Sequence, residues 1–69
     1  MNRRNAKRIK RMAEAVSLYR HVLGDEFATT ETIITDMLTD LRHYCDRHHI
    51  DINQKLFQSA EHFRAEGGG

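Results

Sequence analysis

Hydrophobic positions in the first third of the chain recur at the spacing of a helix. They follow one another at alternating steps of three and four residues: Ile9, Met12, Val16, Tyr19 and Leu23. This spacing keeps the side chains on one face of a helix, so the pattern predicts a helix over residues 4–23. Gly24 comes directly afterwards and favours the left-handed backbone conformation with which helices often end.

The middle of the chain repeats the pattern. A second apolar face consists of Ile34, Leu38, Leu41, Cys45 and His48, and it is widened on one side by Ile33, Met37 and Tyr44. We expect a helix over residues 30–48. Thr29 and Thr30 can each act as its N-cap, and the negative charge of Glu31 suits the first turn. His48 closes the apolar face, which predicts a partly buried side chain.

The last third predicts a helix over residues 52–66. Its apolar face consists of Ile52, Leu56, Phe57, Ala60 and Phe63. Asp51 and Gln54 have the spacing of a capping box, in which the side chain at the N-cap accepts a backbone hydrogen bond. Residues 67–69 are three glycines, which predict a flexible tail.

Three helices joined by short loops favour antiparallel neighbours, and nothing in the sequence is typical of a strand. We therefore expect one all-α domain over residues 4–66, folded as a three-helix antiparallel bundle or hairpin. A chain of 69 residues has little apolar surface with which to form a core. Small domains of this kind are often stabilised by oligomerisation, so we expect homodimerisation to complete the fold.

Composition excludes several classes of protein. No run of apolar residues is longer than two, which argues against a transmembrane helix and against the apolar segment of a signal peptide. Cys45 is the one cysteine and cannot form an internal disulfide, so nothing favours a secreted fold held together by disulfides. We expect a cytoplasmic protein that has no contact with membranes.

Charge is segregated along the chain. Residues 1–13 carry a charge of +6, whereas residues 14–69 carry −5, so the net charge of +1 hides a strongly basic N-terminal segment. Its cations are Arg3, Arg4, Lys7, Arg8, Lys10 and Arg11. In a helix they form two neighbouring rows, which could bind phosphates and release counterions. We assign residues 1–11 as a basic extension of the first helix, and its composition resembles arginine-rich nucleic-acid-binding segments. A solvated tail and an acidic protein partner are the alternatives.

Histidines and carboxylates form a second group of candidates. Asp40 and His43 follow the apolar face of the second helix, and His62 and Glu66 lie four residues apart on the third. If the two helices pack against each other, these four side chains could bind a divalent metal or form a histidine base. Ion pairs on exposed helix faces are the simpler interpretation. Since no metal-binding or nucleophilic motif is present, we expect neither an enzyme nor a cofactor.

Residues 38–66 resemble a family of short bacterial and phage open reading frames. The shared residues are Leu38, Asp40, Leu41, His43, the Cys45–Asp46 pair, and a closing segment from Ala60 to Glu66 that contains His62 and Phe63. In the family an aromatic residue usually follows the second aspartate, whereas here Asp51 precedes Ile52. The resemblance implies a phage or mobile element as the setting and implies no mechanism.

Three hypotheses about function follow. The first is a small regulatory protein that binds nucleic acid through its basic N-terminal helix. The second is an inhibitor or adaptor that binds to the surface of a host protein. The third is a helical protein that binds a metal through Asp40, His43, His62 and Glu66.

Overall fold

In the computed structural model, which describes the backbone of residues 3–68 and the side chains of residues 5–68, the chain forms three helices. Helix α1 spans Arg3–Leu23, α2 spans Thr30–Arg47 and α3 spans Ile52–Ala65, and no strand occurs among the described residues. The predicted all-α class is therefore confirmed, and each predicted helix ends within one residue of its observed bounds.

Local hydrogen bonds account for the helix ends. The side chain of Thr29 accepts a hydrogen bond from the backbone N–H of Thr32, so Thr29 rather than Thr30 is the N-cap of α2. The carboxylate of Asp51 accepts from the N–H groups of Asn53 and Gln54 at the start of α3. At the end of α1, Gly24 has the expected positive φ of 71°.

Helix α2 ends in a Schellman motif without a glycine. The N–H of Ile50 donates to the carbonyl of Cys45 at 2.8 Å, and the N–H of His49 donates to that of Asp46 at 3.2 Å. This geometry requires a left-handed backbone at His49, where φ is 57°. A histidine adopts this conformation only at a cost, because its Cβ approaches the neighbouring carbonyl oxygen.

We expect His49→Gly to stabilise the protein by about 0.5–1 kcal/mol, since the relief of this strain outweighs the extra freedom of glycine in the unfolded chain. Urea denaturation followed by circular dichroism measures the change. His48→Gly is the matched control: φ at His48 is −99°, so glycine gains nothing there and lowers stability. Equal effects of the two substitutions would contradict the prediction.

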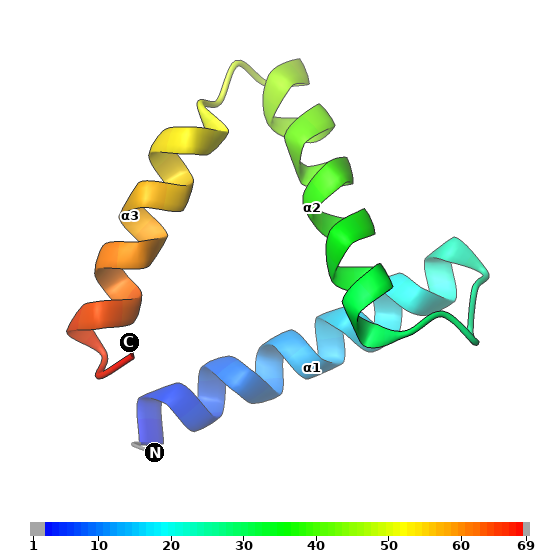
Figure 1. The fold of residues 1–69 in the computed structure, drawn as a ribbon, viewed down its shortest axis with the longest axis horizontal. Coiled ribbons are helices and arrows are strands. Elements are labelled where there is room, and N and C mark those ends of the chain that lie inside the picture. The colour runs from blue at the N-terminus through cyan, green and yellow to red at the C-terminus, as the bar shows by residue number, and fades with distance from the viewer. Residues whose placement is uncertain (1–2, 69) are drawn as a thin grey trace.

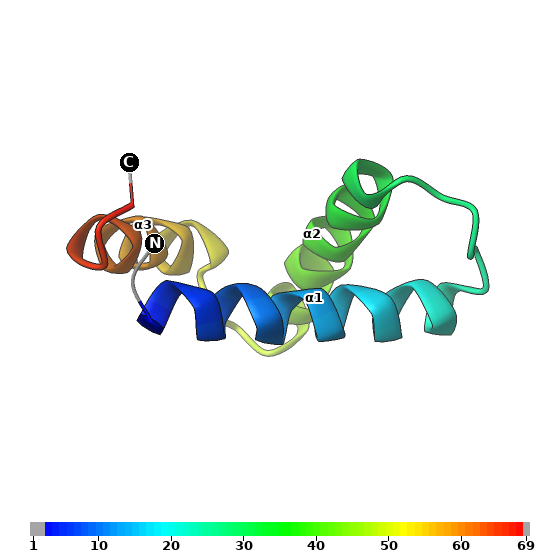
Figure 2. The same cartoon turned by 90° about the horizontal axis from the view of Figure 1, so that it is seen from below.

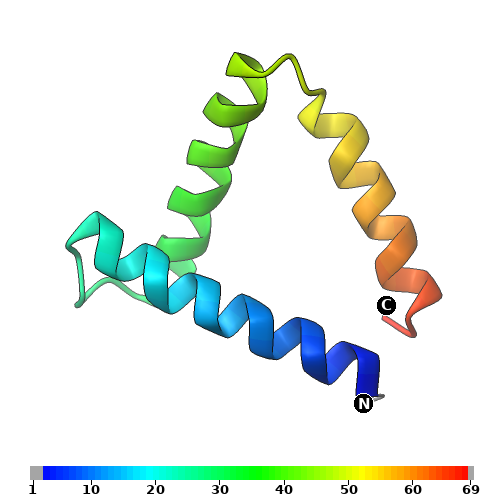
Figure 3. The ribbon, with the colours of Figure 1, turned by 180° about the vertical axis from the view of Figure 1, so that it is seen from behind.

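The three helices lie along the sides of an open triangle (Figures 1 and 3). The start of α2 crosses α1, α3 turns away from the end of α2, and the end of α3 returns to the start of α1. The molecule measures 35 × 30 × 16 Å, and α2 is inclined to α1, so that its start rises away from α1 (Figure 2). The expected antiparallel bundle is not the arrangement found, because α2 crosses α1 at an angle and α3 diverges from α2 instead of packing along it (Figure 1).

Polar contacts hold the third corner of the triangle together. Glu66, just after α3, accepts a hydrogen bond from the side chain of Asn5 at its backbone carbonyl, and its carboxylate pairs with Arg8 at 2.7 Å. Gly67 and Gly68, assigned above to a flexible tail, donate backbone hydrogen bonds that cap α3. Gly69 lies outside the described residues. The cap positions Glu66 against α1.

Very little of the apolar surface is covered within one chain. Among residues 5–68, the buried apolar side chains are Ile33, in the part of α2 that crosses α1, and Cys45, near the corner between α2 and α3. The middle of the same apolar face, which includes Leu38 and Leu41, stays almost half exposed. The core of the single chain is thus confined to the corners of the triangle.

Candidate functional site

The N-terminal half of α1 carries the cations predicted to bind nucleic acid. Lys7, Lys10 and Arg11 are exposed. Lys10 and Arg11 lie three and four residues after Lys7, so that both are its neighbours on one face of the helix. The backbone of Arg3 and Arg4 is part of α1, but their side chains lie outside the described part of the structure.

Three of the four cations whose side chains are described form no ion pair, although Glu14 lines the same surface hollow as Lys7, Lys10 and Arg11. Within residues 5–68, no carboxylate lies within ion-pair distance of Lys7, Lys10 or Arg11. Arg8 differs, because it pairs with Glu66; the two side chains are 51% and 12% exposed. Arg8 therefore links α1 to the end of α3 instead of joining the exposed cationic face. That face consists of Lys7, Lys10 and Arg11.

The four candidate metal ligands do not come together. Asp40 accepts a hydrogen bond from the Tyr19 hydroxyl, and Glu66 is paired with Arg8 on the other side of the molecule. His43 and His62 are exposed on separate helices. In the part of the chain that the structure describes, no three His, Cys, Asp or Glu side chains are placed to hold a metal ion. The expected meeting of the two rows fails because α2 and α3 diverge from their shared corner (Figure 1).

Two further histidines lie on the surface, one at the end of α2 and one on α1. His48 is exposed, not partly buried as expected, and its ring stacks on Tyr44 with 4.3 Å between the ring centroids. It is exposed because α3 turns away from the end of α2 and does not cover that part of the helix. His21 is exposed on α1, with Nδ1 3.9 Å from the Glu26 carboxylate.

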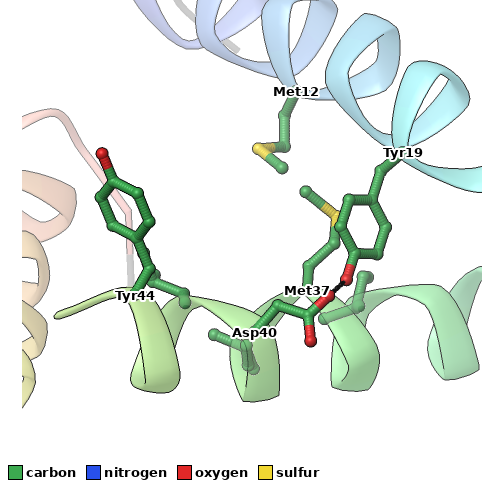
Figure 4. A pocket seen from close by; sticks show the side chains of 8 residues that line it. Met12, Tyr19, Met37, Asp40 and Tyr44 are labelled. Atoms are coloured by element: carbon green, nitrogen blue, oxygen red, sulfur yellow. Dashed lines mark hydrogen bonds between the residues drawn. The ribbon is translucent and has the colours of Figure 1, made fainter. Parts of the chain in front are cut away.

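An apolar groove occupies the angle between α1 and α2 (Figure 4). It has a volume of about 530 Å³ and is lined by Met12 and Tyr19 from α1 and by Ile34, Met37, Leu38, Asp40, Leu41 and Tyr44 from α2. Asp40 is its one charged residue, and the Tyr19 hydroxyl also lies 3.2 Å from the carbonyl oxygen of Asp36. Sequence reasoning identified most of these residues but assigned them to a core within the chain.

Comparisons with known proteins give no information about the site, so its function is inferred from the chemistry of its residues. No family model, no curated protein and no solved structure matches the chain. The resemblance of residues 38–66 to short phage and bacterial open reading frames stays a prediction. None of the helices formed by the described residues is both long and apolar enough to cross a membrane.

Proposed function

We propose that this protein is a small, non-enzymatic regulatory protein that binds the phosphate backbone of a nucleic acid through α1. The observation that carries the proposal is the cationic face of Lys7, Lys10 and Arg11, which is exposed and has no carboxylate partner among the described residues. Arg3 and Arg4 extend the same basic segment toward the N-terminus.

The shape of α1 supports this partner. An isolated helix is 10–12 Å in diameter, which fits the major groove of duplex DNA, about 12 Å wide. Cations spaced by three and four residues along such a helix can each approach a phosphate, and their mutual repulsion is relieved when they do. Because none of the three is held by an acid, binding breaks no ion pair in this face.

The contacts expected from this face are to phosphates and not to bases. Lysine binds phosphate as a point charge, and the described part of the cationic face has no aromatic side chain that could stack on a base. The proposal is therefore sequence-independent binding, in which affinity is set by charge and salt concentration.

A charge-matched pair of variants tests the proposal. In a gel shift at low salt with generic duplex DNA and with structured RNA, we expect Lys7→Ala/Lys10→Ala/Arg11→Ala to weaken binding roughly tenfold or more. The control, Arg42→Ala/Arg47→Ala/Arg64→Ala, removes the same charge from exposed positions on α2 and α3 and is expected to change binding much less. Equal losses in the two variants, or no shift by the wild-type protein, would refute the proposed function.

A further inference from the structure

The apolar groove between α1 and α2 has no function in the binding of phosphates. Of the eight residues that line it, none is a cation, so a nucleic acid is not its occupant. Ile34, Leu38 and Leu41 continue the apolar face whose ends, Ile33 and Cys45, are buried. The groove is thus the middle of a core-forming face that no element among residues 5–68 covers.

The exposed area of the chain is too large for a folded monomer of its mass. A compact protein of 8.1 kDa exposes about 4,500 Å². This chain exposes 6028 Å², an excess of roughly 1,500 Å². A stable interface of standard size covers about 800 Å² on each partner. The excess is therefore large enough to supply such an interface.

The dimensions of the molecule also differ from those of a compact monomer. Its radius of gyration is 13.6 Å, whereas a compact domain of this length has a value of about 11 Å. Protein domains consist of at least two packed layers of secondary structure, because each layer must bury one apolar face. Here α1 and α2 overlap only where the start of α2 crosses α1, so the described helices do not form a second layer over the groove (Figure 1).

We propose that a second copy of this chain supplies that layer, by docking its own α1–α2 groove onto this one in a symmetric dimer. A twofold contact joins identical patches, so the same lining residues, seven uncharged ones and Asp40, meet on both sides. The described part of every copy lacks this layer, and another copy is present wherever the chain is made. The net charge of +1 per chain opposes the contact only weakly.

The Tyr19 hydroxyl donates a hydrogen bond to the Asp40 carboxylate, so this carboxylate keeps a hydrogen-bond partner when the groove is covered, although its charge is not neutralised. The proposal does not depend on nucleic-acid binding, since none of the three cations of α1 lines the groove.

Analytical ultracentrifugation of the wild-type chain and two variants tests the proposal. We expect a wild-type dimer. Leu38 is 45% exposed in the groove, and Leu38→Glu should weaken self-association roughly 100-fold or more, because each dimer would then bury two unpaired carboxylates. Leu18→Glu is the matched control, since Leu18 is 65% exposed on α1 outside the groove, and this variant should remain dimeric.

A second measurement covers the case in which Leu38→Glu does not fold. The melting temperature of an obligate dimer rises with protein concentration, so we expect the wild-type Tm to increase over a hundredfold range of concentration. A wild-type monomer whose Tm is independent of concentration overturns the proposal and leaves the groove to a different protein. Equal behaviour of the two variants also overturns it, because the groove would then not be the interface.

Discussion

Raising the monovalent salt concentration from 50 to 200 mM is expected to weaken nucleic-acid binding by a factor between about 40 and about 500. The lower value corresponds to three phosphate contacts per chain, from Lys7, Lys10 and Arg11; the higher value adds Arg3 and Arg4. Each neutralised phosphate releases close to one counterion, so the slope of log affinity against log salt is about −2.7 for three contacts and about −4.5 for five.

Fluorescence anisotropy with a labelled duplex, repeated at several salt concentrations, measures this slope. The variant without Lys7, Lys10 and Arg11 should lose about 2.7 from the magnitude of the slope, whereas the Arg42/Arg47/Arg64 variant should keep the wild-type value. A slope near zero in the wild-type protein would mean that binding, if present, is not made to phosphates.

Ile33→Ala is expected to destabilise the protein by about 2–5 kcal/mol, which is enough to unfold much of so small a domain. Ile33 is 0% exposed and is one of the two buried apolar side chains among residues 5–68, so its truncation leaves a cavity where α2 crosses α1. Few other contacts can compensate for the loss.

Ile9→Ala gives the matched comparison, because Ile9 is 54% exposed on α1 and lies outside the groove. We expect a change of less than about 1 kcal/mol for this variant. Urea denaturation followed by circular dichroism at one fixed protein concentration provides both values. Similar destabilisation by the two substitutions would show that Ile33 is not the centre of the core.

Local features of the fold could be predicted because their causes lie within a few residues. Thr29 and Asp51 cap the helices that follow them through hydrogen bonds to backbone groups two or three residues away. The left-handed conformation of His49 was not predicted, since glycine is the usual residue at that position.

Long-range contacts explain why some predictions about the site differ from the structure. Glu66 was grouped with His62 because both share one helix face, but its carboxylate pairs with Arg8, nearly sixty residues away in the sequence. Asp40 likewise contacts Tyr19 of α1 instead of a histidine. No spacing rule connects such pairs, because the angles between the helices decide which side chains meet.

The amino-acid sequence by itself determined the three helices, their ends and the basic segment that begins α1, since helix periodicity, capping and charge are properties of neighbouring residues. Only the tertiary structure decided that the helices form an open triangle, and that Leu38 and Leu41 line a groove instead of a core. An amphipathic pattern shows which face of a helix is apolar. Which element covers this face depends on contacts between segments that are distant in the sequence.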